Sequence, residues 1–356
     1  MDLPAESFMA RAIALARRGF PAPNPRVGCV IERDGVIVGE GWHRYRGTDH
    51  AEVMALKRAR DLAQGARVFV TLEPCNHQGL TGPCSEALIQ AGVSKVVFAC
   101  WDPNPVAQGG AARLREAGIQ VDQGLLEQEA ARGNELFLRS IALGRAVLVL
   151  KAATSEDGSL GLPDRQIWLT GPKARRSAHR LRAECGAVLV GRGTIEVDDP
   201  LLTARIPGVR NQPIRLVMDP GGSLGPYFRV FQNGGQTWRI TAPGKGGQIE
   251  LPIDGEDLDL EALLVELYRR GVRAVLVEGG AETLRRFWAA GLTDYVEIFV
   301  APTVLGGGMV WEDGLALREG RWPDFEKVGE RKLDGDVHLS FRRRSAPDWC
   351  ILRSRP

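Results

Sequence analysis

The chain has 356 residues, of which 44% are hydrophobic and 25% are charged, and its formal net charge is +2. This length favours two domains, and this composition is typical of a folded globular protein rather than a disordered one. The near-neutral charge and the lack of like-charge blocks argue against nucleic acid or a membrane as a partner.

The location of the protein is predicted from its apolar runs and its cysteines. No run reaches the ~18 apolar residues that predict a transmembrane helix, and the first ten residues lack the basic-then-apolar pattern of a secretory signal. The cysteines are scattered along the chain, which argues against a disulfide framework. We therefore expect a cytoplasmic protein.

Helix and strand patterns alternate through the first part of the chain. A helix is expected at 5–18, and Asp34-Gly35 is typical of the turn between two hairpin strands. Strands that alternate with helices favour a sheet covered by helices, an α/β sandwich with an antiparallel hairpin at one end. A further helix is expected at 126–143. The expected strands are 27–32, 36–42, 67–72 and 95–99, and the helices among them are 51–63, 85–91 and 111–117.

A second domain is expected to begin with the apolar strand 146–153, after a boundary near Gly144. This gives domains 1–144 and 145–356. The stretch 221–255, rich in Gly and Pro, has no clear pattern. Further strands are expected at 187–190, 214–218, 274–277 and 294–300, and helices at 172–183 and 258–269.

Three short motifs in the first domain predict a catalytic zinc site. His50 begins a predicted helix, Cys75 follows a predicted strand, and Cys84 begins the next helix. These three ligands would leave the fourth tetrahedral position open to water, as catalytic zinc requires. Glu52 would then be free to move protons between the water, the ring and the leaving amine. Base deaminases have this order of His-x-Glu and Pro-Cys motifs, although here eight residues lie between the cysteines instead of two.

The same residue types also have plainer interpretations. A lone His-x-Glu occurs by chance, and cysteines in a reducing compartment are usually core residues, as we expect for Cys29. The combination of three motifs favours the zinc site. His43 either faces the pocket or is an ordinary hydrogen-bonded histidine, and His77, between the two cysteines, is the better pocket candidate.

Motifs along most of the chain resemble those of the bifunctional riboflavin-biosynthesis deaminase/reductases, in the order of that family. Such enzymes carry a cytidine-deaminase-like α/β/α sandwich followed by a dihydrofolate-reductase-like α/β domain. The long gap between the two cysteines is itself a trait of this family. The matching segments are 24–30, 50–52, 71–75, 102–105, 151 with 157–158, 168–172, 181–183, 198–203 and 277–280.

The resemblance implies two successive reactions. The first domain would use Zn²⁺ to deaminate a diaminopyrimidinone that carries a 5-phosphoribosylamino group. The second would use NADPH to reduce the ribosyl group to a ribityl chain. The partners would be this small-molecule substrate and further copies of the chain, associated through the reductase domain.

The resemblance also assigns residues to the binding sites. A strand–glycine–helix junction at Gly280 would offer free backbone N–H groups to a phosphate, although most such junctions are plain loops. Arg182 and Arg205 would clamp the substrate phosphate with bidentate hydrogen bonds. The cofactor residues would be Thr154, Trp168, Thr194, Asp198 and Gly280, and the substrate residues Asn24, His77, Lys151, Gln166, Arg182, Leu202, Arg205 and Glu278.

The sequence departs from the family pattern at five positions. Leu80 stands where a basic residue is usual and Gly82 where a proline is usual, and Glu156, Ser159 and Gln166 alter the start of the reductase domain. The last three changes motivate a second hypothesis, a zinc deaminase whose C-terminal domain does not reduce. Two further classes of protein share parts of the pattern. They are a deaminase of nucleic-acid bases, which the charge disfavours, and a non-catalytic zinc protein, which would have no use for Glu52.

Overall fold

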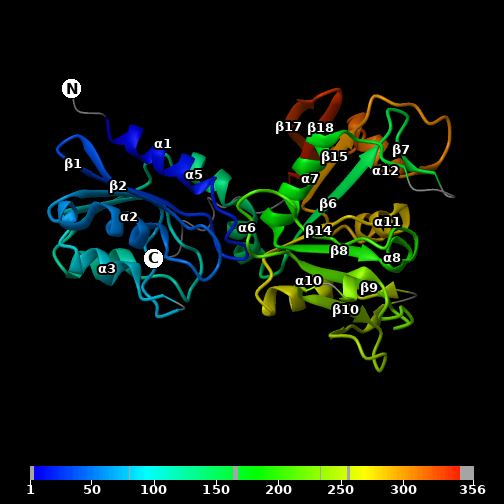
Figure 1. Cartoon of the computed structure of the whole chain (residues 1–356), viewed down its shortest axis with the longest axis horizontal. Coiled ribbons are helices and arrows are strands. Elements are labelled where there is room, and N and C mark those ends of the chain that lie inside the picture. The colour runs from blue at the N-terminus through cyan, green and yellow to red at the C-terminus, as the bar shows by residue number, and fades with distance from the viewer. Residues whose placement is uncertain (1–3, 80, 163–166, 233, 255–256, 345–356) are drawn as a thin grey trace. The chain divides into compact units, whose positions relative to one another are not determined.

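The computed structural model describes residues 4–79, 81–162, 167–232, 234–254 and 257–344 (Figure 1). They form two compact units, of which the first extends to Ala142 and the second begins at Leu143. No helix in these ranges is both long and apolar enough to cross a membrane.

The first unit is built on one sheet with an antiparallel hairpin at its edge. Asp34 and Gly35 have φ angles of 52° and 81°, so the predicted two-residue hairpin turn is confirmed. β1 is antiparallel to both of its neighbours, whereas β3, β4 and β5 are parallel. The strand order is β2 (Val36–Trp42), β1 (Gly28–Arg33), β3 (Arg67–Leu72), β4 (Lys95–Cys100) and β5 (Gln120–Gln123).

Helices cover both faces of this sheet, as the α/β/α prediction requires (Figure 1). On β3, Val68 and Val70 pack into one core, whereas Phe69 packs into the other, because successive side chains of a strand point to opposite faces. The helices of the first core are α2 (Ala51–Ala59), α3 (Cys84–Gln90) and α4 (Gly110–Glu116), and those of the second are α1 (Ala5–Ala16), α5 (Glu127–Gly133) and α6 (Glu135–Leu143).

The single helix expected at 126–143 is interrupted at Asn134. The Asn134 side chain accepts a hydrogen bond from Arg26 N at 2.7 Å and donates one to Arg26 O at 2.8 Å. An asparagine that bonds to backbone in this way favours a break over a continuous helix. The two hydrogen bonds of Asn134 hold the irregular segment before β1, in which Asn24 lies.

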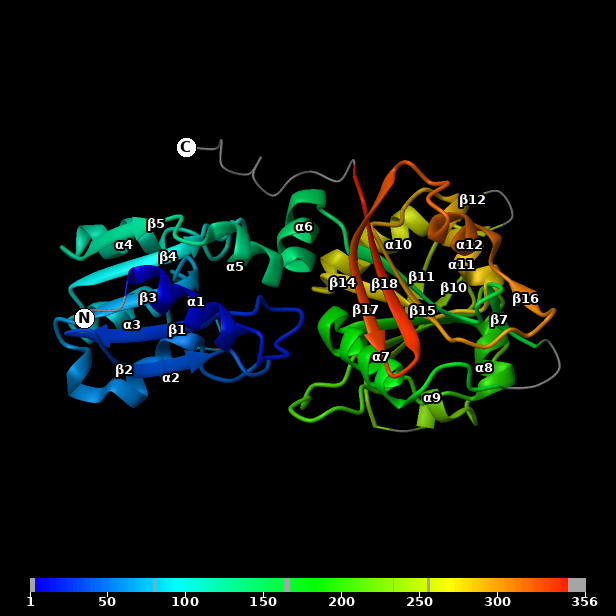
Figure 2. The same cartoon turned by 90° about the horizontal axis from the view of Figure 1, so that it is seen from above.

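The second unit is built on a larger sheet that is parallel from β11 to β15 and has an antiparallel β17–β18 hairpin beside β15 (Figure 2). The strand order is β11 (Ile249–Glu250), β10 (Thr237–Thr241), β9 (Ile214–Met218), β8 (Ala187–Gly191), β14 (Ala274–Val277), β6 (Val147–Thr154), β15 (Tyr295–Val300), β18 (Asp336–Arg343) and β17 (Phe325–Leu333).

The buried strands of this unit agree with the prediction, and the exposed ones were missed. β8, β9 and β14 begin at the predicted residues, and the expected helices are α7 (Pro172–Cys185) and α10 (Leu260–Arg269). Strands of a parallel sheet are buried on both faces and so appear as apolar runs. β17 and β18 are rich in charged residues and partly exposed, so they carry no such run. β10 lies in the Gly- and Pro-rich stretch that had no clear pattern.

The parallel arrangement brings distant residues to one edge of this sheet. Thr154 ends β6, Gly191 ends β8, and Glu278 follows β14 directly. Because β6, β14 and β8 are adjacent and parallel, their carboxyl ends meet at this edge, where ligands of open α/β sheets bind. Helices α8 (Arg192–Asp198) and α11 (Ala281–Ala289) begin there.

Candidate active sites

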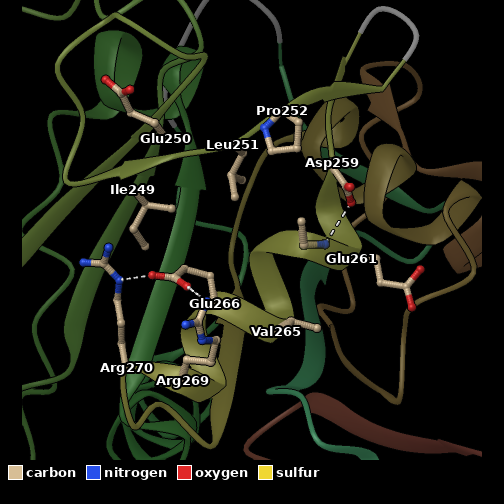
Figure 3. A pocket seen from close by; sticks show the side chains of 11 residues that line it. Ile249, Glu250, Leu251, Pro252, Asp259, Glu261, Val265, Glu266, Arg269 and Arg270 are labelled. Carbon is tan, nitrogen blue, oxygen red and sulfur yellow. Dashed lines mark hydrogen bonds and ion pairs between the residues drawn. The ribbon is translucent and has the colours of Figure 1, made fainter.

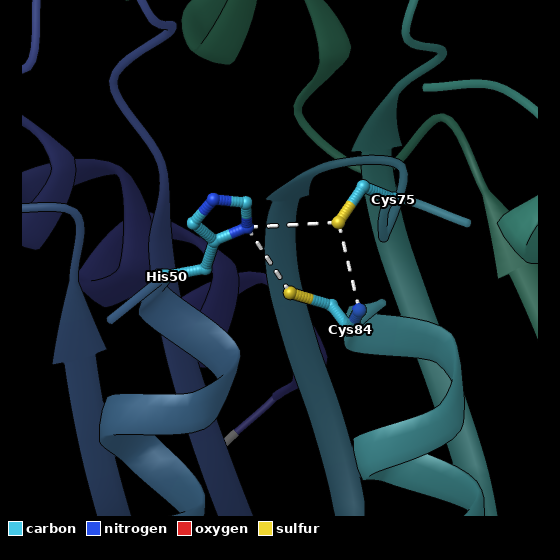
Figure 4. A group of neighbouring side chains, drawn as sticks. All are labelled: His50, Cys75 and Cys84. Carbon is cyan, nitrogen blue, oxygen red and sulfur yellow. Dashed lines mark hydrogen bonds between the residues drawn. The ribbon is translucent and has the colours of Figure 1, made fainter. Parts of the chain in front are cut away.

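Two polar groups of side chains stand out, one in each unit. In the first unit, His50, Cys75 and Cys84 converge (Figure 4). Their nearest ligand atoms are His50 Nδ1 and Cys84 Sγ at 3.3 Å, and His50 Nδ1 and Cys75 Sγ at 3.6 Å. Within the described residues, no other set of three or more His, Cys, Asp or Glu side chains converges in this way.

The geometry of this cluster fits a zinc ion. A tetrahedral zinc with ordinary Zn–N and Zn–S bonds separates neighbouring ligand atoms by about 3.6 Å. The two measured distances from His50 Nδ1 are close to this value. Three protein ligands leave one coordination position for a water or a substrate, which is the pattern of a catalytic site.

Helix starts and a strand end position the three ligands. His50 is the N-cap of α2, Cys84 is the first residue of α3, and Cys75 follows β3. The hydrogen bond from Cys84 and the contact with His50 outweigh burial, which by itself raises a thiol pKa, and they lower the pKa of Cys75 to about 4. A thiolate is the form that binds metal, so the group is prepared for an ion.

Glu52 lies beside this cluster and is almost completely buried. Burial, followed by the nearby Cys75, raises the pKa of Glu52 to about 7. A carboxyl group with such a pKa can take up and release a proton near neutral pH, as a general base and acid must. The predicted proton carrier and the predicted ligands therefore lie together.

Two further histidines of the first unit carry buried ring nitrogens without a hydrogen-bond partner in the described residues, namely His43 Nε2 and His77 Nδ1. The His43 ring centroid lies 5.1 Å from that of His50. Burial, followed by the nearby His50, lowers the pKa of His43 to about 4, so this ring is neutral. Buried polar atoms are nearly always hydrogen-bonded, and a polar ligand would satisfy these two.

In the second unit, Glu278 joins two of the predicted substrate residues. Its carboxylate accepts hydrogen bonds from Arg182 Nε at 2.7 Å and from Arg182 Nη2 at 2.9 Å. Lys151 Nζ lies 3.8 Å from Glu278 Oε2. Burial alone would raise the pKa of Glu278, but Arg182 and Lys151 outweigh it and lower this pKa to about 2. The carboxylate is therefore ionised.

This arrangement bears on the expectation that Arg182 contacts substrate. The bidentate edge of Arg182 is occupied by Glu278, and its Nη1 donates to Thr203 O at 2.9 Å. Arg182 therefore does not offer the free fork expected for a substrate phosphate. Arg205 is exposed, and its Nη1 donates to Thr203 Oγ1 at 3.0 Å.

A residue not predicted from the sequence belongs to the same group. His179 Nδ1 lies 3.0 Å from Thr203 O, the oxygen that also accepts from Arg182. Leu202, predicted to contact substrate, is buried with a φ of 53°. A single histidine on a basic helix gives little indication of function in the sequence. In the structure, His179 lies three residues before Arg182, so both side chains are on one face of α7.

Two observations fit a nucleotide cofactor at the carboxyl edge of the sheet. The hydroxyl of Thr154 is buried and has no hydrogen-bond partner in the described residues. Gly280 is the N-cap of α11 and leaves its first N–H groups without a side-chain cap. A ligand that carries a phosphate could accept hydrogen bonds from the free N–H groups at the start of α11 and bond to the Thr154 hydroxyl.

The remaining cofactor and substrate predictions have different surroundings. Trp168 is 72% exposed, with the Arg175 guanidinium 5.3 Å from its ring centroid. Thr194 and Asp198 lie on α8. Asn24 lies before β1 and donates from its backbone to Pro21 O. Gln166 and Leu80 are outside the described residues.

Of the residues that depart from the family pattern in the second unit, Glu156 lies in a turn and Ser159 begins strand β7 (Ser159–Gly161). Ser159 is buried, and its N–H donates to Ser155 Oγ at 2.9 Å. Glu156 N donates to Thr303 O at 2.8 Å. The Asp157 carboxylate accepts from Ser155 Oγ and from the backbone of the 305–306 turn. These two departures from the family pattern are thus compatible with a folded segment.

The second unit has a groove between β11 and α10 (Figure 3). Its lining includes Ile249 and Leu251 on one side and Val265 on the other, with Glu266 paired to Arg270 at 2.7 Å. None of the predicted site residues lines it, so we assign no reaction to this groove.

Comparison with known proteins gives a consistent result for both units. Residues 4–100 match the family model for the cytidine and deoxycytidylate deaminase zinc-binding region. Residues 146–339 match the model for the RibD C-terminal domain.

Curated relatives match along most of the chain. The riboflavin biosynthesis protein RibD of Escherichia coli is 40% identical over 324 residues, which cover 85% of this chain and 88% of the relative. RibD of Aquifex aeolicus is 39% identical over 352 residues, which cover 95% and 98%.

Solved structures match at the level of the whole fold. RibD of Acinetobacter baumannii superposes with a TM-score of 0.85 and 37% identity, covering 96% of this chain and 99% of the other. A diaminohydroxyphosphoribosylaminopyrimidine deaminase/5-amino-6-(5-phosphoribosylamino)uracil reductase of Thermotoga maritima superposes with a TM-score of 0.81 and 35% identity, covering 95% and 98%.

Proposed function

The chain belongs to the RibD family of riboflavin-biosynthesis enzymes, and from this premise we propose which of its residues carry out deamination and which carry out reduction. It is a zinc-binding deaminase and a reductase that acts on a pyrimidine. We assign deamination to residues 1–144 and reduction to residues 145–356. The observation that carries the assignment is the convergence of His50, Cys75 and Cys84 beside the buried Glu52.

The proposed substrate of the first unit is 2,5-diamino-6-(5-phosphoribosylamino)pyrimidin-4-one. Zinc held by the three ligands would supply Lewis acidity that activates the attacking water. Glu52 accepts one proton from this water and passes it to the ring nitrogen, and it then carries the second proton of the water to the departing amine, so that the C–NH2 group becomes C=O and ammonia leaves. Its burial supports this role, because a dry carboxyl group holds its proton more tightly.

Substrate recognition in the first unit is assigned to groups around the zinc cluster. His43 Nε2 and His77 Nδ1 hydrogen-bond the polar edge of the heterocycle, which would satisfy both nitrogens. Asn24 contacts the substrate from the segment that Asn134 anchors. A small set of fixed polar groups around an apolar ring is how such pockets obtain specificity.

The second unit is proposed to reduce the deaminated product. NADPH would supply the hydride for the ribosyl carbon. Lys151 donates the proton that accompanies it, and Glu278 holds the Lys151 ammonium in place. The cofactor residues are Thr154 and Gly280, together with Trp168, Thr194 and Asp198.

We favour reduction over a non-reducing C-terminal domain because Lys151, Arg182 and Glu278 form one connected ionic group. An assay of the whole chain with zinc, NADPH and the diaminopyrimidinone, in which ammonia and NADPH are followed separately, tests both assignments. Ammonia release without NADPH oxidation would refute the reductase assignment, and the reverse would refute the deaminase assignment.

Two properties of the protein in the cell are also proposed. By analogy with the family we expect a homo-oligomer formed through the reductase unit, and a cytoplasmic location. Light scattering after size exclusion of the whole chain would test the first, since a monomer at assay concentration would refute it. Fractionation of cells would test the second.

A further inference from the structure

One backbone oxygen in the second unit accepts two side-chain hydrogen bonds from the same helix. His179 Nδ1 lies 3.0 Å from Thr203 O, and Arg182 Nη1 lies 2.9 Å from it. Both donors are on α7, three residues apart, and therefore on one face of the helix. The carbonyl group can only accept, so the proton of the neutral His179 ring must be on Nδ1.

The segment that contains this oxygen has an unfavourable backbone. Leu202, with a φ of 53°, is a branched, buried residue in the left-handed region, where side chains other than glycine are strained. The Gln212 side chain holds the next peptide, accepting from Ala204 N at 2.8 Å and donating to Ala204 O at 3.3 Å. Strain of this kind persists only where the surroundings fix it, and it is concentrated at functional sites.

The segment 202–205 ends with Arg205, an exposed cation of the proposed reductase site. Arg205 follows Ala204, and its Nη1 donates to Thr203 Oγ1 at 3.0 Å. Arg182 is occupied by Glu278, so it does not offer its bidentate edge to an anion. The position of the Arg205 guanidinium therefore depends on how the 202–205 segment is held.

We propose that His179 is a positioning residue of the reductase site, which fixes the Thr203 carbonyl group so that Arg205 meets the phosphate of the pyrimidine substrate. This inference rests on the proposed reduction of a phosphorylated pyrimidine by the second unit. His179 acts as a neutral donor, since burial and the nearby Arg182 and Arg205 lower its pKa to about 4. It holds the backbone and takes no part in hydride or proton transfer.

The test compares two variants of the whole chain. His179→Asn places an amide N–H close to the position of Nδ1 and keeps the donor, whereas His179→Leu removes it. Steady-state NADPH oxidation is measured with the deaminated intermediate, 5-amino-6-(5-phosphoribosylamino)uracil. KM is determined for this intermediate and for NADPH, and ammonia release from the diaminopyrimidinone reports on the first unit of the same chain.

The inference predicts that His179→Leu raises KM for the pyrimidine roughly tenfold, the effect of losing one hydrogen bond that positions a charged contact. KM for NADPH and the rate of ammonia release stay within about twofold of wild type in this prediction. His179→Asn recovers most of the lost affinity. With a substrate analogue that lacks the phosphate, His179→Leu and wild type have the same KM.

Three results would overturn the inference. They are an unchanged KM for the pyrimidine in His179→Leu, an equal loss with the analogue that lacks phosphate, and no recovery by His179→Asn. A wild-type chain that oxidises no NADPH with the intermediate would instead refute the proposed reduction, and this inference with it. The two failures are thus distinguishable.

Discussion

Glu278 and Arg182 form a bidentate ion pair, with oxygen–nitrogen distances of 2.7 and 2.9 Å, that joins the end of β14 to helix α7. The two residues are 96 positions apart in the sequence and both are largely buried. Breaking a buried pair leaves an uncompensated charge, which costs far more than an exposed pair contributes. The pair therefore fixes both the geometry and the charge of the second site.

Replacing Arg182 is expected to destabilise the second unit. Arg182→Leu would leave the Glu278 carboxylate with only Lys151, and we expect the free energy of unfolding to fall by about 3 kcal/mol. Urea unfolding of the whole chain measures this loss. Arg180→Leu is the matched control, because its pair with Glu184 on the same helix is more exposed and should contribute at most about 1 kcal/mol. Equal losses for the two variants would contradict the account.

The low pKa of Glu278 predicts how stability depends on pH. Its pKa is about 2 in the folded chain, below the value of 4.5 for a free glutamate, so the ionised form stabilises the fold at and above neutral pH. This contribution, on the order of 3 kcal/mol, is lost as the pH falls from about 4.5 towards 2. Wild type should therefore exceed Glu278→Gln in unfolding free energy above about pH 5, and the difference should shrink in acid. A difference independent of pH would refute this interpretation.

The zinc ligands are predicted to be separable from the proton carrier. Glu52→Gln should keep one zinc per chain but slow ammonia release by about 10²–10⁴-fold, because it removes only proton transfer. Cys84→Ser should lose zinc as well. Cys100→Ser serves as the control, a buried cysteine of the same unit whose Sγ contacts Glu127 O instead. Metal content is measured by mass spectrometry, and zinc loss in Glu52→Gln would show that the assigned role is wrong.

Asn134 is predicted to matter for deamination although it lies outside the zinc cluster. Asn134→Ala removes both side-chain hydrogen bonds to the Arg26 backbone. Leaving these groups unpaired should lower the free energy of unfolding by about 1–3 kcal/mol and raise KM for the diaminopyrimidinone. Gln128→Ala, at an exposed position of α5, should change stability by less than about 0.5 kcal/mol. An unchanged KM in Asn134→Ala would show that the segment held by Asn134 does not contribute to substrate binding.

The first site could be predicted from the sequence because its ligands occur in local motifs. His50 and Cys84 each begin a helix and Cys75 follows a strand, so spacing and residue type together identified them. The second site lacks this property. Arg182 on α7 and Glu278 after β14 are brought together only by the tertiary fold, and without the family resemblance Arg182 would be taken for a surface charge.

The residues that were missed had no local signal. His179 is one polar residue on a basic helix, and its role depends on a carbonyl oxygen 24 positions away. The break at Asn134 depends on a contact 108 positions away, so the helical pattern at 126–143 concealed it. The ion pair of Arg182 could not be predicted for a similar reason, since its partner Glu278 is a residue that the sequence does not place beside it.

The most direct test of the central claim, that one chain deaminates in its first unit and reduces in its second, uses Glu52→Gln with each substrate in turn. With zinc, NADPH and the diaminopyrimidinone, this variant should release almost no ammonia and oxidise almost no NADPH. With the deaminated intermediate it should oxidise NADPH at the wild-type rate. Loss of NADPH oxidation with both substrates would contradict the assignment of the two reactions to separate sites.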